Sequence, residues 1–208
     1  MLELFQSGGW LMWPLLLCSI LALAIVLERL WTLRESKILP QKLVQNILGE
    51  FAKKSRTVHL PNLAYQSPLG SILATGLKYR EQGVSTMRAR MEEQGRQVVM
   101  QLEKYLNALG TIAAIAPLLG LLGTVVGMIN VFSVLNLGGA SNAEALAGGI
   151  AQALLTTAFG LSIAILSLMF HRHFHRKMDE LSSKLESESL SLIDGLRAMV
   201  SKDKDIVI

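Results

Sequence analysis

The side chains best placed for chemistry in this sequence are a few polar groups inside two long apolar segments, 106–135 and 145–170. They are Thr124 in the first segment and Gln152, Thr156 and Thr157 in the second. A hydroxyl or an amide in such a segment can hydrogen-bond to a neighbouring helix, to water or to a group in transit. These residue types therefore predict either contacts between helices or a polar path through a membrane.

Small residues accompany the polar groups at helical spacing. The first stripe comprises Ala113, Pro117, Gly120, Thr124 and Gly127, and the second comprises Gly149, Gln152, Ala153, Thr156, Thr157 and Gly160. Residues three and four positions apart share one face of a helix. Because small residues let membrane helices approach closely, helix packing alone would explain both stripes. An ion path along the same faces is the alternative interpretation.

A titratable group is missing from both segments. No Asp, Glu, Lys or Arg lies between Lys104 and Glu144, or between Glu144 and His171. Proton paths through membranes normally use Asp, Glu or His. If protons cross here, another polypeptide must supply the acid. Glu144 follows Ser141 at the spacing of a helix capping box, and an acidic pore mouth is the alternative role for it.

Hydropathy predicts that both segments cross a membrane, together with a third near the amino end. The chain has 208 residues, of which 51% are hydrophobic, and its mean hydropathy is +0.41. Roughly 20 apolar residues span a hydrocarbon core of about 30 Å. The third segment, 10–31, is uncharged as far as Leu27 and has Trp10, Trp13 and Trp31 at interfacial positions.

Charge placement predicts the topology. All 20 Lys and Arg lie in two blocks, 29–104 and 172–204. Basic residues favour the cytoplasmic side, so we expect residues 1–9 and the loop 136–144 on the outer side. The net charge of +4 does not indicate nucleic acid binding, because both blocks also contain acidic residues and lack interleaved aromatic residues.

The predicted fold is all-α, an integral membrane protein with three transmembrane helices at 10–31, 106–135 and 145–170. Residues 32–86 are expected to form short helices interrupted by prolines. From Ser85 onward the pattern predicts one helix of about 50 residues that continues into the second span. The third span is predicted to continue into the tail 171–208. Within the regions 32–105 and 171–208, these two extensions are expected to pack as a cytoplasmic helical bundle.

No pattern in the sequence indicates an enzyme. Walker loops, nucleophile elbows and paired cysteines are absent. His171, His173 and His175 lie close together, but basic residues are common where a helix leaves the membrane, and metal binding is the less favoured alternative. We therefore expect no metal, no cofactor and no catalytic residue.

The stretches 116–127 and 152–161 resemble the corresponding motifs of the MotA/TolQ/ExbB proton channel family. The plan of three spans resembles the ExbB and TolQ branch, most of all ExbB, because MotA has four spans. The resemblance implies a homopentamer whose second and third helices surround a pore. That pore would hold an ExbD- or TolR-like partner with a single span, whose membrane Asp supplies the missing acid.

Carried over by position, Thr124 and Thr157 would be the pore threonines of spans two and three. On the interpretation of the two small-residue faces as an ion path, further residues line the same pathway, namely Thr156, Gln152, Gly120, Gly127, Gly160 and Pro117. One position departs from the pattern: Gln152 stands where ExbB proteins often have Glu. An amide cannot release a proton, which leaves it hydrogen bonding to water or to the partner Asp.

The function implied is that of a stator subunit in the bacterial inner membrane, with the amino end periplasmic and the carboxyl end cytoplasmic. It would use the proton motive force to energise TonB-dependent outer-membrane uptake through a TonB-like protein. Besides these proteins, membrane lipid is the only further partner expected. The alternatives are a TolQ-like subunit acting with a TolA-like protein in the Tol-Pal system, a passive membrane scaffold, and a sodium-driven motor.

Overall fold

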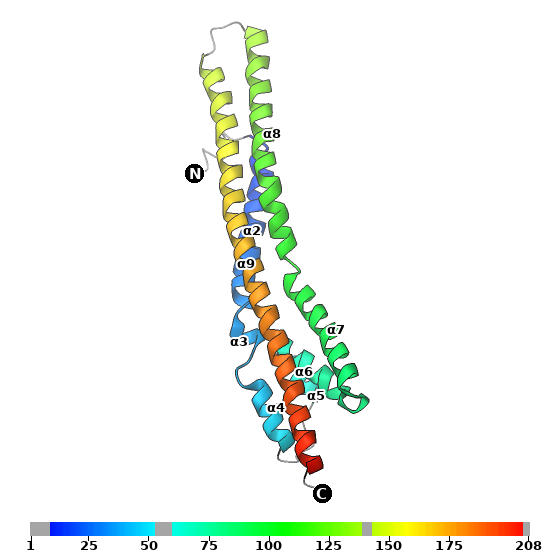
Figure 1. Ribbon diagram of the computed structural model, residues 1–208. Coiled ribbons are helices and arrows are strands. Elements are labelled where there is room, and N and C mark those ends of the chain that lie inside the picture. The colour runs from blue at the N-terminus through cyan, green and yellow to red at the C-terminus, as the bar shows by residue number, and fades with distance from the viewer. Residues whose placement is uncertain (1–8, 53–59, 139–142, 206–208) are drawn as a thin grey trace. The chain divides into compact units, whose positions relative to one another are not determined.

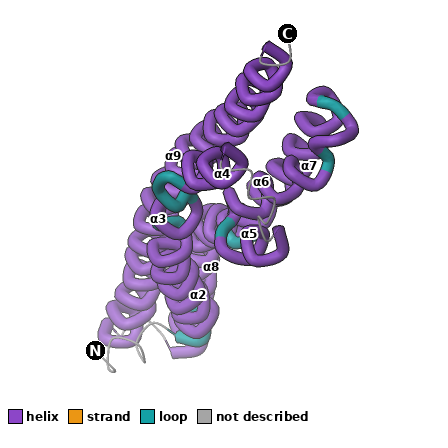
Figure 2. The backbone as a smooth tube through the Cα atoms, turned by 90° about the horizontal axis from the view of Figure 1, so that it is seen from below, coloured by secondary structure: helices purple, strands orange, loops and turns teal. Residues whose placement is uncertain are grey.

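The computed structural model describes residues 9–52, 60–138 and 143–205. Within these ranges the chain consists of helices joined by short loops and contains no strand (Figure 2). Three helical stretches are long and apolar enough to cross a membrane: Met12–Thr32, Val84–Ser133 and Leu146–Met199. The predicted all-α membrane class is therefore confirmed.

Three helices build the first of two compact units, which comprises Met1–Arg29 and Tyr105–Phe174. They are α2 (Met12–Thr32), α8 (Leu106–Gly138) and the first part of α9 (Ala143–Asp205). Figure 1 shows α8 and α9 side by side in this unit. Apolar residues of all three helices meet in its core: Met12 and Leu15, Ala116 and Leu119, and Phe159, Ile163 and Ala164.

The helix ends lie close to the predicted ones. The expected loop 136–144 is shorter in the structure, because α8 continues to Gly138 and α9 begins at Ala143. Ser141 and the side chain of Glu144 lie outside the described residues. The capping box therefore stays a prediction.

The expected single helix from Ser85 through the second span is interrupted: the apolar helical stretch Val84–Ser133 has a break of two residues. The structure has two helices, α7 (Val84–Glu103) and α8, with Lys104 and Tyr105 between them. At this interruption the Arg29 guanidinium lies 5.0 Å from the centre of the Tyr105 ring, and its Nε is 2.6 Å from a Glu28 carboxylate oxygen. Only 3% of Arg29 is exposed. The sequence has no Gly or Pro here, so the helical pattern alone gave no sign of the interruption.

The second unit comprises Leu30–Lys104 and His175–Ile208. Its helices are α3 (Glu35–Ile38), α4 (Leu43–Ala52), α5 (Leu60–Gln66), α6 (Pro68–Lys78), the 3₁₀ helix η1 (Arg80–Gln82), α7 and the remainder of α9.

Helix α6 has defined ends and lies in the core of this unit. The Ser67 hydroxyl caps it by accepting a hydrogen bond of 3.0 Å from the backbone N–H of Gly70. Beyond its carboxyl end, Gly83 adopts a positive φ of 98°, a conformation that glycine tolerates best, and α7 follows. Gly76 brings α6 against Met87 and Met91 of α7. The expected short helices before α7 are confirmed.

The carboxyl-terminal part of α9 buries an apolar stripe at helical spacing, comprising Met178, Leu181, Leu185 and Leu192. An ion-pair cluster lies beside it. Glu35 of α3 is 2.5 Å from the Lys184 ammonium and 3.8 Å from that of Lys177. The hydrogen bond and charge of Lys184, with a smaller effect of Lys177, lower the pKa of Glu35.

This cluster predicts a pH dependence of stability. Because the folded-state pKa of Glu35 is lowered, its contribution is present above the unfolded-state pKa of about 4.3 and is lost as pH falls through the folded value. The thermal midpoint of Glu35→Gln should therefore lie below that of wild type at pH 6, and the difference should shrink as the pH falls below about 4.3. Glu188→Gln, an exposed site on α9, is the control and should show no such difference. An undiminished difference for Glu35→Gln at acidic pH would contradict the prediction.

Candidate functional site

The backbones of α8 and α9 touch where two glycines face each other. A Cβ atom added to Gly160 would lie 2.6 Å from the Ala116 carbonyl oxygen and 3.0 Å from the Gly120 Cα. A Cβ on Gly120 would lie 3.1 Å from the Thr157 Cα. Both contacts involve backbone atoms that cannot turn aside. Glycine at these positions therefore sets the closest approach of the two helices.

The same interface continues along both helices through other small residues. Gly123 lies against the Thr156 side chain. A Cβ on Gly127 would lie 2.8 Å from the Ala153 Cβ and 3.1 Å from the Gly149 carbonyl oxygen. Gly123 and Gly127 form a GxxxG pair, the spacing that favours close packing of membrane helices.

The threonine hydroxyls all donate their protons within the chain. Thr157 Oγ1 donates across the interface to the Gly120 carbonyl oxygen, at 2.9 Å. Thr156 Oγ1 bonds to carbonyl oxygens of its own helix, those of Gln152 at 3.0 Å and Ala153 at 2.9 Å. Thr124 Oγ1 donates to the Leu121 carbonyl oxygen, at 2.6 Å. Each hydroxyl oxygen keeps acceptor capacity.

The structure brings most of the predicted site residues into one interface. Residues from both helices meet there: Gly120 and Gly127 from α8, and Thr156, Thr157 and Gly160 from α9. Thr156 is only 1% exposed in this chain, because it is enclosed by α8. Packing between helices is the role that these contacts show directly.

The remaining predicted residues lie at the margins. Pro117 and Thr124 are half-buried, and α8 continues through Pro117 as a helix. Gln152 is half-buried, and its side-chain amide lies against Gly9, just before α2. Its neighbour within the chain is therefore the start of the first span, a contact that the sequence did not reveal.

The stripe of small residues predicted for α8 differs from the set of α8 residues that the structure buries. From position 116 onward the buried residues of α8 are Ala116, Gly120, Gly123, Gly127 and Val131, whereas the predicted stripe included Ala113, Pro117 and Thr124. The prediction placed Thr124 among the glycines, but it lies at the edge of their face. Ala116 and Gly123 were missed as contact residues. The signal that could have found them is the repeated small-xxx-small spacing, 116 with 120 and 123 with 127.

His171 belongs to the packing of the same hairpin. A Cβ added to Gly110 of α8 would lie 2.7 Å from its Nε2 atom, so this glycine makes room for the imidazole. No group of three or more His, Cys, Asp or Glu that could hold a metal occurs in the part of the chain described by the structure.

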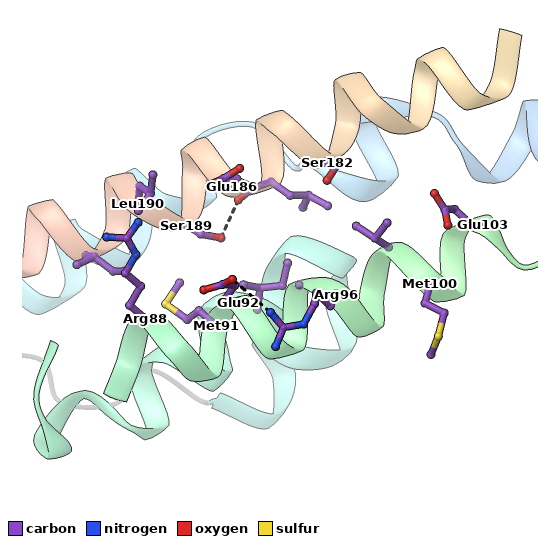
Figure 3. A pocket seen from close by; sticks show the side chains of 15 residues that line it. Arg88, Met91, Glu92, Arg96, Met100, Glu103, Ser182, Glu186, Ser189 and Leu190 are labelled. Atoms are coloured by element: carbon purple, nitrogen blue, oxygen red, sulfur yellow. Dashed lines mark hydrogen bonds and ion pairs between the residues drawn. The ribbon is translucent and has the colours of Figure 1, made fainter. Parts of the chain in front are cut away.

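A separate cavity of about 470 Å³ lies in the second unit, between α7 and α9, with Ile72 of α6 also in its wall (Figure 3). It contains none of the threonines discussed above. Its Arg96 pairs with Glu92 at 3.2 Å and also with Glu93. The pKa of Glu93 is lowered and that of Arg96 is raised, chiefly by their mutual hydrogen bond. Both helices line this cavity, and the expected packing of α9 beside the extension of span two stays a prediction.

The motif pair of α8 and α9 agrees with the comparison to known families. Residues 64–187 match the model of the MotA/TolQ/ExbB proton channel family, and the chain belongs to this family. It is a multi-pass membrane protein of a transport family.

Named relatives support this membership over most of the chain. The biopolymer transport protein ExbB-like 1 of Synechocystis sp. is 41% identical over 83% of this chain and 69% of its own length. The ExbB-like 3 protein of the same organism is 31% identical over 81% of this chain and 82% of its own length. The ExbB homolog of Methanothermobacter thermautotrophicus is 28% identical, covering 89% and 66% of the two chains. Among the family's branches, this chain is most like ExbB.

The glycine contact yields a test with a matched control. Gly160→Ala should destabilise the hairpin by about 1–3 kcal/mol, because the added methyl group meets backbone atoms of α8. Gly148→Ala, on the same helix, adds its methyl group to open space and should have little effect. Thermal unfolding in detergent measures both variants, and equal stability of the two would contradict the packing described here.

Proposed function

We propose that this protein is the proton-channel stator subunit of an inner-membrane motor for biopolymer transport, energising TonB-dependent uptake. An ExbD-like single-span partner would supply the titrating Asp. The observation that carries the proposal is a pair of apolar segments, 106–135 and 145–170, without a titratable group, in which the hydroxyls of Thr124 and Thr157 are oriented by internal hydrogen bonds.

The hydrogen bonds suit a protonated guest acid better than an ionised one. A neutral carboxyl group can donate its proton to the free lone pairs of either hydroxyl. A carboxylate only accepts, and it needs donors that these threonines already use elsewhere. Proton binding to the partner Asp would therefore favour the threonine environment, and proton release would drive the Asp away from it.

The two threonines lie at similar depth in the hairpin. Gly123 packs against Thr156, and Thr124 and Thr157 are the next residues on the two helices. This arrangement supports the idea that both can serve one Asp as the partner rotates or shifts. The electrical driving force is about 2.3 kcal/mol per charge per 100 mV, enough to bias such a step. Several protons would be needed for work on the outer membrane.

The proposed assembly is a homopentamer around a partner dimer, with the amino end periplasmic and the carboxyl end cytoplasmic. The two basic blocks support this orientation. The ExbB names of the relatives favour an ExbB-like subunit over a TolQ-like subunit of the Tol-Pal system.

A passive membrane scaffold is the second candidate function. It is favoured by one observation, namely that Gly120, Gly127, Thr156 and Gly160 are used for packing within the chain. A scaffold of this kind would hold the partner without conducting protons, so that loss of the threonine hydroxyls would not matter.

The threonines provide the deciding test. Thr124→Val and Thr157→Val should each lower uptake driven by the proton motive force on the order of fivefold, the effect of losing one hydrogen bond. Thr111→Val is the control, because this exposed threonine of α8 likewise bonds to its own helix, at Asn107. Native mass spectrometry should show unchanged assembly with the partner. Normal uptake by both variants would favour the scaffold.

The coupling ion is tested separately. Changing the sodium gradient at constant membrane potential should leave uptake unchanged, because the motor proposed here is driven by protons. A proportional change in uptake would identify a sodium-driven motor.

A further inference from the structure

The last turn of α2 carries an exposed tryptophan. This helix has 21 residues, so it is about 30 Å long and matches the hydrocarbon thickness of a bilayer. Trp31, one residue before its end, is 62% exposed. Exposed residues of the same helix face lead to it at helical spacing: Ile20, Leu23 and Leu27. An exposed indole at the end of an apolar stripe is typical of the boundary between acyl chains and headgroups.

Two cations follow this indole. The Lys37 ammonium lies 3.3 Å from the centre of the Trp31 ring, a close cation–π contact. Arg34, at the start of α3, is exposed as is Lys37. Neither cation has a carboxylate partner in the part of the chain that the structure describes.

The acidic residue nearest to these cations in the sequence, Glu35, forms ion pairs with other lysines. Glu35 is the only acidic residue between Glu28 and Glu50 in the sequence. It pairs with Lys184 and Lys177 of α9, at 2.5 and 3.8 Å. Arg34 and Lys37 are therefore left as uncompensated positive charges next to an interfacial indole.

We propose that Trp31, Arg34 and Lys37 form a binding site for an anionic phospholipid. The two cations would bind the headgroup phosphate, and the acyl chains would lie along the exposed apolar face of α2. This continuous apolar stripe is the reason for choosing a lipid over a free phosphate ion. The site is independent of the proposed transport function, since it rests only on membrane insertion.

Lipid binding to the purified full-length protein in neutral detergent tests the proposal. Native mass spectrometry should show that phosphatidylglycerol binds more tightly than phosphatidylcholine. The double variant Arg34→Gln/Lys37→Gln should weaken phosphatidylglycerol binding about fivefold for each charge removed. The charge-conserving variant Arg34→Lys/Lys37→Arg should retain it, and circular dichroism checks that each variant is folded.

The matched control also removes one Lys and one Arg, but at another cation–π pair of the same unit. Lys78 lies 5.7 Å from the centre of the Tyr79 ring, and Arg80 follows in the sequence, but neither adjoins a membrane span. Lys78→Gln/Arg80→Gln should bind phosphatidylglycerol as wild type does. Unchanged binding by the Arg34/Lys37 variant, equal affinity for both lipids, or displacement of the lipid by inorganic phosphate would overturn the proposal.

Discussion

The close approach of α8 and α9 is the constraint on which the membrane unit depends. It exists because Gly160 presents no side chain to the Ala116 carbonyl and to Gly120. This contact allows the Thr157 hydroxyl to reach a carbonyl oxygen of the other helix, at 2.9 Å. Separating the helices by the width of a methyl group would break that bond and leave the hydroxyl free to donate to another acceptor. The close packing of α8 and α9 thus also fixes the orientation of the Thr157 hydroxyl.

The lack of charge in the hairpin follows from the same geometry. A tightly packed interface between two helices leaves little room for the water or counter-charge that a buried carboxylate requires. A chain built in this way can offer hydrogen-bond acceptors at fixed positions, but it cannot itself take up and release protons. The chemistry and the scaffold are therefore best divided between two polypeptides, as we propose for this subunit and its partner.

The sequence predicted the features that depend on local pattern. Apolar length located the three spans, and helical spacing predicted the long continuation of α9. It failed where a tertiary contact decides the outcome. At all three such places residues of other elements are in contact: Arg29 at Tyr105, Gly9 at Gln152, and α9 along the α8 stripe. Thr124 illustrates the limit, since a shift of one residue moves a side chain by about 100° around a helix.

The interruption between α7 and α8 makes the two long helical segments of this chain unequal in continuity. Helix α9 runs through 63 residues without a break, whereas Lys104 and Tyr105 separate α7 from α8. A torque about the axis of α9 must be carried by its continuous hydrogen-bond ladder. The same torque on α8 can be relieved by a few backbone torsion angles at the two linking residues. Of the two helices that form the hairpin, only α9 thus has a hydrogen-bond ladder that continues unbroken beyond the membrane segment.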